Sequence, residues 1–97
     1  MFAVSFTENA LEDLRPYPKS DQVRLIDITV EQLSADPATP TRRKKELRPN
    51  DLSRWELRIG DYRVFYDVNE TTQHVSVKSV GVKQHNKLLI RGQEHKL

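Results

Sequence analysis

The stretch from Trp55 to Val68, WELRIGDYRVFYDV, constrains the fold of this chain more than any other. It is rich in aromatic and β-branched residues, which suit the pleated and half-buried surface of a β-sheet. Gly60 supplies the positive φ that a tight hairpin turn requires, and Asp61 tolerates the neighbouring position. The stretch therefore predicts two antiparallel strands joined by a short turn.

The two predicted strands alternate between core-facing and outward-facing positions. The positions expected to face the core are all apolar: Trp55, Leu57, Ile59, Val64, Tyr66 and Val68. The opposite face is expected to carry Arg54, Glu56, Arg58, Arg63, Phe65 and Asp67. Because successive side chains of a strand point to opposite faces, three arginines gather on one face away from the core. Such a face is suited to binding an anion.

The N-terminal part of the chain predicts one strand and two helices. Residues 2–6 form a short strand, and Thr7 is placed to cap a brief helix that ends before Pro16. Ser20 or Asp21 could cap a second helix, which runs to about residue 34. Its core-facing stripe is expected at Val23, Ile26, Val30 and Leu33, widened by Leu25 and Ile28.

The C-terminal part predicts a basic segment, the hairpin, a further strand and a tail. Segment 42–48, RRKKELR, is expected to be an anchored loop with Leu47 turned inward. A strand is expected over residues 74–82, where Val75 and Val77 share one face but Val80 and Val82 share the other. Either a β-bulge or a strand buried on both faces would explain this change. Residues 83–97 form a basic tail with an apolar patch.

These elements predict a single α+β domain over residues 1–97. We expect an N-terminal strand and two helices, followed by a three-stranded antiparallel meander. The helices are expected to pack on one face of the sheet. The arginines of the hairpin would then lie on the face that the helices leave uncovered.

The charge of the chain is unevenly distributed. Residues 1–41 carry three Lys and Arg against seven Asp and Glu, whereas residues 42–97 carry thirteen against seven. A positive half suggests an anionic partner, of which nucleic acid is the commonest. The alternative is ordinary surface charge that is unevenly placed in a small protein.

Several classes of function are disfavoured by the sequence. The chain has no cysteine, which excludes disulfides and thiolate metal sites and fits a reducing cytoplasm. The three histidines, His74, His85 and His95, lack the spacing of a metal site. There is no glycine-rich phosphate loop and no apolar run long enough for a membrane span. We therefore expect a cytoplasmic protein with no metal, no cofactor and no membrane association.

The remaining polar residues are suited to metal-free RNA cleavage. That reaction needs a base for the 2′-hydroxyl, cations for the charge on the phosphorane, and an acid for the leaving 5′-oxygen. Arg63 is either a phosphate clamp or an ion-pair partner of Asp61, Asp67 or Glu56. Glu56 is either a base or the partner of an arginine. His85 could act as the acid, and Lys83 could stabilise charge from the same end of the strand.

The hairpin, followed by VGVKQHNKLLIRG at residues 80–92, resembles the RelE/ParE superfamily of type II toxin–antitoxin toxins. The resemblance covers nearly the whole chain, including the KELR segment before the hairpin. It implies that Arg63 binds the scissile phosphate and that Arg54 matches a basic residue of the preceding strand. The pattern departs at Glu56, where lysine is expected, and at Lys83, where arginine is expected. Leu89 stands near the position of an expected tyrosine.

RelE-type members of the superfamily are ribosome-dependent endoribonucleases that cut mRNA and inhibit translation, whereas ParE-type members inhibit DNA gyrase. The resemblance therefore implies a toxin that a cognate antitoxin neutralises in a hetero-oligomer. Of these, mRNA cleavage is our first hypothesis, with Arg54, Arg58 and Lys83 aiding Arg63. We expect Lys44, Lys45 and Arg48 to contact ribosomal RNA. Glu46, Glu56 and His85 could supply the acid–base groups that some relatives use.

Three alternatives stay open. The chain could be a gyrase inhibitor, a catalytically decayed toxin that only binds its antitoxin, or a nucleic-acid-binding regulator without toxicity. The antitoxin is expected to cover apolar helical surface and the tail patch of Leu88, Leu89 and Ile90. Those three residues could equally pack on the protein's own core.

Overall fold

The predicted hairpin forms the middle of the sheet. In the computed structural model, which describes residues 1–97, β3 (Trp55–Ile59) and β4 (Tyr62–Asn69) pair antiparallel across a two-residue turn. Gly60 has a φ of +58° in that turn, in the left-handed region that glycine adopts without a Cβ clash. The predicted hairpin and its turn are confirmed.

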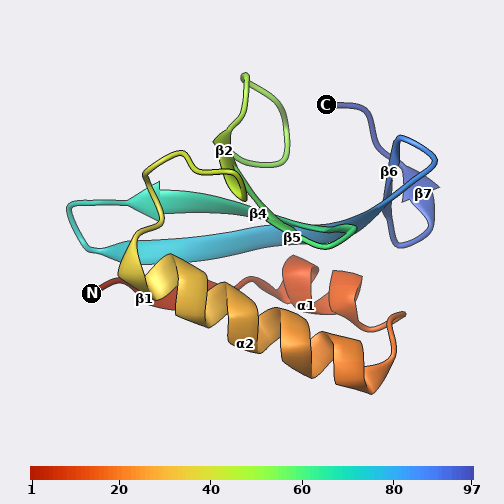
Figure 1. Cartoon of the computed structure of the whole chain (residues 1–97), viewed down its shortest axis with the longest axis horizontal. Coiled ribbons are helices and arrows are strands. Elements are labelled where there is room, and N and C mark those ends of the chain that lie inside the picture. The colour runs from red at the N-terminus through yellow and green to blue at the C-terminus, as the bar shows by residue number, and fades with distance from the viewer.

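The complete sheet has seven strands in the order β2-β3-β4-β5-β6-β7, with β1 also paired to β5 (Figure 1). β1 (Ala3–Phe6) runs parallel to β5 (His74–Gln84), and all other pairs are antiparallel. Three strands were not predicted, namely β2 (Lys44–Glu46), β6 (Lys87–Ile90) and β7 (Gln93–Glu94). The basic segment and the tail therefore extend the meander at its two ends.

A β-bulge in β5 explains the change of face in its valines. The pairing of β4 with β5 shifts between Phe65 and Tyr66, which leaves Lys78 without a partner on β4. The extra residue reverses the alternation of β5, so Val77 and Val80 both face the core and are fully buried. Of the two explanations that the sequence left open, the bulge is the correct one.

The two helices begin differently. Thr7 caps α1 (Glu8–Leu14) as predicted, because its Oγ1 accepts a hydrogen bond from the Ala10 amide at 3.1 Å. α2 (Lys19–Ala35) begins after Pro18 and has no side-chain cap, so the predicted cap at Ser20 or Asp21 is wrong. The Asp21 carboxylate instead accepts a hydrogen bond from the Tyr62 hydroxyl at 2.9 Å, which ties the start of α2 to the sheet.

The buried row of α2 is Leu25, Thr29 and Leu33, spaced four residues apart. Two of the four residues predicted for the core stripe are wrong, since Val23 is 50% exposed and Val30 is 40% exposed. The predicted stripe and the observed row each contain several apolar side chains, so the sequence pattern alone does not distinguish them. Contact with β1 and β3 selects between them, and this contact depends on the tertiary structure.

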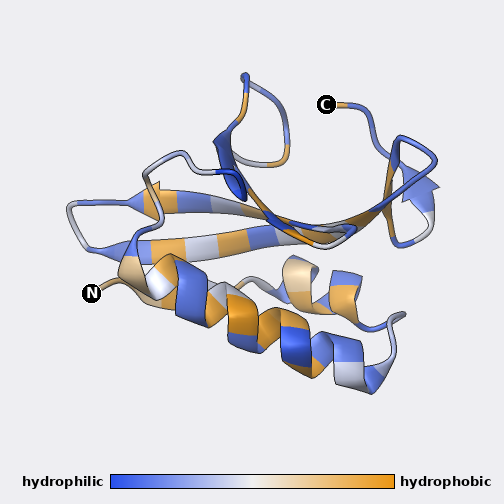
Figure 2. Ribbon diagram, viewed as in Figure 1, coloured by the Kyte–Doolittle hydropathy of each residue, from blue (hydrophilic) through white to orange (hydrophobic).

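Both helices cover the same face of the sheet, as expected for this α+β arrangement (Figure 1). Hydrophobic and hydrophilic residues alternate along β4 and β5, which is the pattern of strands with one buried face (Figure 2). The core between the layers contains Ala10, Leu14, Leu25, Leu33, Trp55, Leu57, Ile59, Val64, Tyr66, Val75, Val77 and Val80. Neither helix has the length and apolar character that crossing a membrane requires.

A buried carboxylate joins α1 to the C-terminal half of the sheet. Asp13 is 1% exposed, and its Oδ2 accepts hydrogen bonds from the Ser79 hydroxyl at 2.7 Å and the Val80 amide at 3.0 Å. Its Oδ1 accepts from Arg91 Nε at 2.6 Å, and Arg91 also donates to the Asn9 side chain. Both carboxylate oxygens are therefore satisfied, which is the condition for burying a charge at acceptable cost.

Replacing this carboxylate should destabilise the fold. We expect Asp13→Ala to lower the free energy of unfolding by about 3 kcal/mol, because Ser79, Val80 and Arg91 all lose their acceptor. The matched control is Asp27→Ala on the exposed side of α2, which should change the free energy of unfolding by less than about 0.5 kcal/mol. Urea denaturation of both variants measures the difference, and equal stabilities would contradict the assigned role of Asp13.

Candidate nucleic-acid interface

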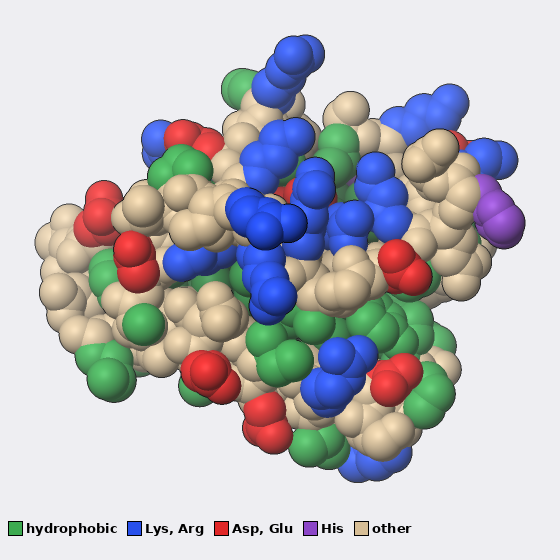
Figure 3. Space-filling model, viewed as in Figure 1, with side chains coloured by type: hydrophobic (Ala, Val, Ile, Leu, Met, Phe, Trp, Pro, Cys, Tyr) green, Lys and Arg blue, Asp and Glu red, His purple; other side chains and the backbone are tan.

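The sheet face that the helices leave uncovered, here called the outer face, carries the predicted cationic cluster. Arg58 on β3 lies directly opposite Arg63 on β4, and Lys45 on β2 lies opposite Glu56 on β3. Lys83 follows two residues after Gly81, the β5 partner of Arg63. Lys and Arg side chains gather over the sheet on the side away from the helices (Figure 3). The hairpin register thus brings together cations from four strands.

Arg63 is the most restrained of these cations. Its side chain is 13% exposed, and Nη1 donates hydrogen bonds to the carbonyls of Gly60 at 2.9 Å and Tyr62 at 3.0 Å. Its Nε lies 4.0 Å from Glu56 Oε1, which is within ion-pair range but too far for a hydrogen bond. That buried Nε–H has no hydrogen-bond partner. Arg63 therefore combines an ion pair with one buried donor that has no acceptor.

Burial and neighbouring charges shift the pKa of the Arg63 guanidinium in opposite directions. Burial lowers the pKa of its guanidinium below the ordinary value, and the carboxylate of Glu56 acts in the opposite direction by favouring the charged form. The positive charge of Arg58 lowers the pKa of Arg63 further. Because arginine stays protonated in proteins, Arg63 remains a cation that is only partly neutralised.

Glu56 is the carboxylate at the centre of the cluster. It is 4% exposed, and its Oε2 accepts a weak hydrogen bond from Arg58 Nε at 3.4 Å. Arg63 lies on its other side and Lys45 opposite it on β2. Its position matches the predicted ion-pair partner of an arginine, and the same position places it beside the expected phosphate clamp.

Arg54 lies at the other end of β3 and does not join the cluster. Its side chain is 73% exposed, and its Nε donates to Glu46 Oε2 at 2.7 Å. Its backbone amide donates to Asp67 Oδ1 at 2.7 Å. Arg54 and Glu46, which were predicted as a clamp residue and a possible base, therefore neutralise each other away from Arg63.

His85 is also separated from the cluster. His85 and Asn86 have φ of +52° and +65° and form the two-residue turn between β5 and β6, as in a type I′ hairpin. His85 follows four residues after Gly81, a separation of about 13 Å along an extended strand. Lys83 lies closer, on the same side of β5 as the Arg63 partner position. The structure thus brings Lys83 to the cluster more readily than His85.

The basic segment 42–48 contributes different residues from those predicted. Lys44 is 7% exposed and faces the core side, where it lies opposite Leu57 and its Nζ donates to the Asp36 carbonyl. Its predicted contact with ribosomal RNA is therefore wrong. Lys45 and Arg48 are exposed, as that role requires. Arg43, which was not predicted, is exposed just before β2, and its carbonyl accepts a hydrogen bond from the Arg58 amide at 2.7 Å.

The apolar tail patch belongs to the protein's own sheet. Leu88 is 5% exposed on β6, and Leu89 and Ile90 are half-buried. A Cβ on Gly81 would meet the Leu89 carbonyl at 2.8 Å and the Leu88 and Ile90 side chains at 3.0 Å, so β6 packs directly over this glycine. Leu88 is thus buried by the protein itself, although none of the three residues belongs to the core cluster. The predicted antitoxin contact at the half-buried Leu89 and Ile90 stays a prediction.

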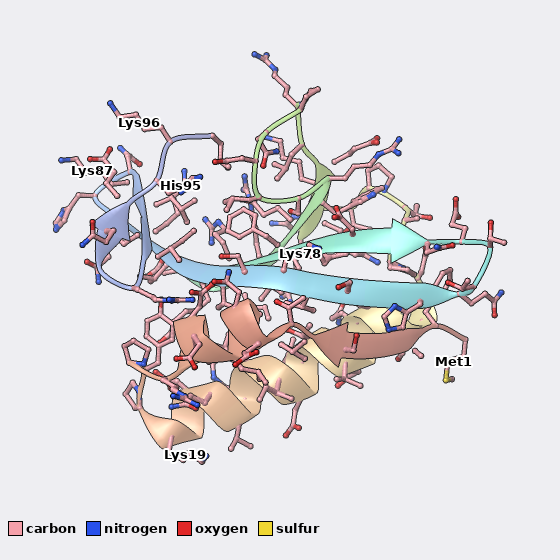
Figure 4. All side chains as sticks on the ribbon, turned by 180° about the vertical axis from the view of Figure 1, so that it is seen from behind. Met1, Lys19, Lys78, Lys87, His95 and Lys96 are labelled. Carbon is pink, nitrogen blue, oxygen red and sulfur yellow. The ribbon has the colours of Figure 1, made fainter.

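The C-terminal residues border the outer face. Lys87, His95 and Lys96 lie on the opposite side of the sheet from Lys19 of α2 (Figure 4). His95 Nε2 lies 3.0 Å from Asp51 Oδ1, which joins the tail to the loop between β2 and β3. This hydrogen bond lowers the pKa of the Asp51 carboxyl. The cluster therefore lies on a face bordered by the β2–β3 loop and the tail.

The largest surface hollow does not coincide with the cationic cluster. It has a volume of about 670 Å³ and is lined by residues 46–54 with Asp67 and Lys78. Neither Arg58 nor Arg63 lines it. A polymer that is held through its phosphates lies along a charged surface, so such a site does not need to be an enclosed pocket.

Comparison with known proteins supports the resemblance seen in the sequence. A family model described as the ParE toxin of the type II toxin–antitoxin system parDE matches residues 4–85. This chain belongs to the ParE toxin family. It is thus a toxin of a type II toxin–antitoxin module within the RelE/ParE superfamily. A search of curated proteins gave no match.

Solved structures show that this toxin has the RelE-like fold. It is similar to a chain of the RelBE2 toxin–antitoxin complex from Mycobacterium tuberculosis, with a TM-score of 0.73 and 26% identity, covering 84% of this chain and 98% of that one. The isolated RelE toxin of E. coli gives a TM-score of 0.65 and 25% identity, and the match covers 88% of this chain and 87% of that one. A chain of the archaeal RelE–RelB complex from Pyrococcus horikoshii OT3 gives a TM-score of 0.64 and 23% identity. This match covers 81% of this chain and 91% of that one, and it supports the fold alone.

Lys44 and Lys45 provide a test of the corrected site. We expect Lys44→Ala to lower the free energy of unfolding by about 1 kcal/mol, because it removes the buried contact with the Asp36 carbonyl. Lys45→Ala should change stability by less than about 0.5 kcal/mol but weaken binding to single-stranded RNA. Thermal melting and filter binding separate the two effects, and the reverse pattern would show that β2 is assigned to the wrong register.

Proposed function

We propose that this toxin cuts mRNA on the ribosome and is neutralised in the cytoplasm by a cognate antitoxin protein. The observation that supports the proposal most directly is the outer-face cluster, in which Arg58, Arg63 and Lys45 surround the single carboxylate of Glu56. This cluster carries a positive excess on a face that no helix covers. Arg63 has a buried and unused N–H there, which is suited to a phosphate oxygen.

The proposed reaction is an in-line attack within the RNA strand. The 2′-oxygen bonds to phosphorus while the bond to the 5′-oxygen of the next nucleotide breaks, leaving a 2′,3′-cyclic phosphate. The 2′-hydroxyl proton passes to a base, and the leaving oxygen takes up a proton. Arg63 and Lys83 would stabilise the negative charge that develops on the phosphorane oxygens.

Glu56 is the candidate base because it is the carboxylate within ion-pair range of Arg63. A phosphate bound by Arg58 and Arg63 would draw those side chains away from Glu56 and bring a ribose next to it. Lys83 is the nearer candidate for protonating the leaving oxygen, whereas His85 would require the substrate to reach the β5–β6 turn. These assignments replace the paired Glu46 and Arg54 as the reacting groups.

The antitoxin surface is proposed on the helices. Apart from the chain termini, the large hydrophobic side chains with high exposure are Leu11, Val23 and Val30. They lie on α1 and α2, away from the cationic cluster. An antitoxin segment that covers them would therefore form a hetero-oligomer without filling the RNA-binding face.

A second candidate function is inhibition of DNA gyrase. It is favoured by the match of the ParE family model and by the separation of His85 from Arg63, because gyrase inhibition needs no acid–base pair. Mapping mRNA 5′ ends after induction distinguishes the two. Cuts within translated codons that disappear when translation is blocked support the ribonuclease, and gyrase-dependent DNA breaks without new mRNA ends support the alternative.

Removing the clamp should abolish toxicity. We expect Arg63→Ala to reduce ribosome-dependent mRNA cleavage by about 100-fold or more and to prevent growth arrest, because it removes donors to the phosphorane. Arg15→Ala is the matched control, since Arg15 is 74% exposed at the end of α1 and pairs only with Glu12. Circular dichroism must show that both variants are folded, and a folded Arg63→Ala protein that still arrests growth would exclude this role.

Replacing Glu56 tests the proposed base. We expect Glu56→Gln to reduce the cleavage rate at saturating ribosomes by at least about 100-fold, since an amide cannot accept the 2′-hydroxyl proton. Binding to a 2′-O-methyl RNA should be retained or strengthened, because one negative charge leaves the cluster. Cleavage at the wild-type rate would mean that Glu56 serves only as a counter-ion for Arg58 and Arg63.

A further inference from the structure

The sheet register aligns three arginines in one row across the outer face. Arg58 lies opposite Arg63, and Arg63 lies opposite Gly81 on β5. On the other side of Arg58, its amide donates a hydrogen bond to the Arg43 carbonyl at 2.7 Å. This bond continues the register in which Lys44 lies opposite Leu57. The row therefore runs Arg43, Arg58, Arg63 and ends at Gly81.

The side chain of Arg43 belongs to the outer face. Arg43 lies one residue before β2, where its carbonyl accepts the hydrogen bond from the Arg58 amide while its own amide donates to Thr41 Oγ1 at 3.2 Å. This place opposite Arg58 assigns its side chain to the face that Arg58 shares. The neighbouring Lys44 confirms this direction, because it points to the core side. Arg43 is exposed, and its side chain takes part in none of the protein's hydrogen bonds or ion pairs. It is a free guanidinium at the end of the row.

The three arginine side chains differ in exposure and in how firmly the protein itself holds them. Arg63 is restrained and 13% exposed, and the Arg58 side chain is 47% exposed and only weakly paired with Glu56. Arg43 is free. Neighbouring strands lie about 4.8 Å apart, so the row spans about 10 Å from β2 to β4. One restrained donor next to two more exposed ones can hold successive phosphates of one flexible strand.

The row is closed at one end and open at the other. At Gly81 the space for a side chain is filled by the Leu89 carbonyl and the side chains of Leu88 and Ile90. A strand bound along the row cannot continue straight past β5 and must turn toward Lys83. At the other end, Arg43 is exposed, and it precedes β2, which is the edge strand of the sheet.

We propose that single-stranded RNA lies across the strands along the Arg43–Arg58–Arg63 row, and that Arg43 binds a phosphate that flanks the scissile one. This inference rests on the proposed function, because it takes the phosphate at Arg63 as the one that is cut. It makes Arg43 a positioning residue that holds the strand in register. The basic segment before the hairpin then contributes to binding through Arg43 and Lys45, on the opposite side of β2 from Lys44.

Arg42 provides a matched control for Arg43. The two residues are adjacent, exposed and equally charged, but Arg42 lies in the bend before β2 and its backbone makes no hydrogen bond to Arg58. The probe is a short single-stranded RNA with 2′-O-methyl groups, which blocks attack and isolates binding. Its affinity for the wild type, Arg42→Ala and Arg43→Ala is measured as a function of salt concentration. Cleavage of mRNA on programmed ribosomes is measured separately.

The inference predicts a specific difference between the two variants. Arg43→Ala should reduce the slope of log affinity against log salt by about 0.7, the value for one phosphate contact in a single strand, and raise KM for cleavage more than it lowers kcat. Arg42→Ala should leave both unchanged. Equal effects of the two substitutions, or no effect of Arg43→Ala on the slope, would overturn the inference.

The same measurements separate this inference from the proposed function. Suppose that the wild type cuts mRNA but that Arg43→Ala and the wild type have the same slope of log affinity against log salt. The proposed ribonuclease function is then supported, and the proposed binding of RNA along the arginine row is wrong. If the wild type binds the RNA with the predicted dependence on Arg43 but cuts no mRNA, the row stands and cleavage is wrong. If the wild type does not bind the RNA at all, the row is overturned, and cleavage on programmed ribosomes alone decides the proposed function.

Discussion

The register of the β3–β4 hairpin is the constraint on which the rest of the structure depends. Because side chains alternate along a strand, a slip of one residue would move the apolar set to the outer face and the arginines into the core. The two-residue turn at Gly60 prevents such a slip, since its left-handed conformation is accessible to glycine at little cost. The same turn therefore determines both the core and the cationic cluster. The turn at Gly60 is therefore a common cause of the fold and of the candidate site.

The cluster itself requires compensation. Arg58 and Arg63 lie opposite each other, and like charges in this arrangement destabilise a sheet. Glu56 lies within ion-pair distance of both, so one carboxylate serves two guanidinium groups. The compensation is incomplete, because the Arg63 Nε–H stays without a partner. A buried donor without an acceptor is costly, and a phosphate oxygen would relieve that cost.

Sequence reasoning was strongest where one face of an element is buried and the pattern is long. The hairpin and the order of β1, the two helices, β3, β4 and β5 were predicted from such patterns, and the family pattern in the hairpin identified the superfamily. The Thr7 cap was predicted from the capping preference of threonine. Sequence reasoning was weakest for short elements with few apolar residues. β2 has three residues, all charged, so its alternation carries no hydrophobic signal and the inward direction of Lys44 could not be read. Arg43 was missed for the same reason.

Other errors arose where tertiary contacts select between equivalent patterns. Two rows of α2 are apolar, and only packing on β1 and β3 shows that Leu25 is buried while Val23 is not. The tail patch was ambiguous because burial within the chain and burial by a partner favour the same residues. Gly81 resolves it for Leu88, since the close approach of Leu88 and Ile90 to its backbone requires a residue without a side chain.

The site as a whole is better organised for holding a phosphate chain than for transferring protons. Three arginines are aligned by strand pairing, whereas the candidate acid–base groups are divided among Glu56 within the cluster, Lys83 beside it and His85 at a distant turn. If it cleaves RNA as proposed, such a toxin would gain rate mainly by positioning the 2′-oxygen in line with the bond that breaks, with Glu56 as the one proton acceptor inside the cluster. The proposed dependence on a ribosome would then have a physical reason, because a flexible mRNA that is presented in a constrained conformation needs less ordering by the toxin itself. The arginine row and the ribosome would divide between them the work of aligning one phosphate.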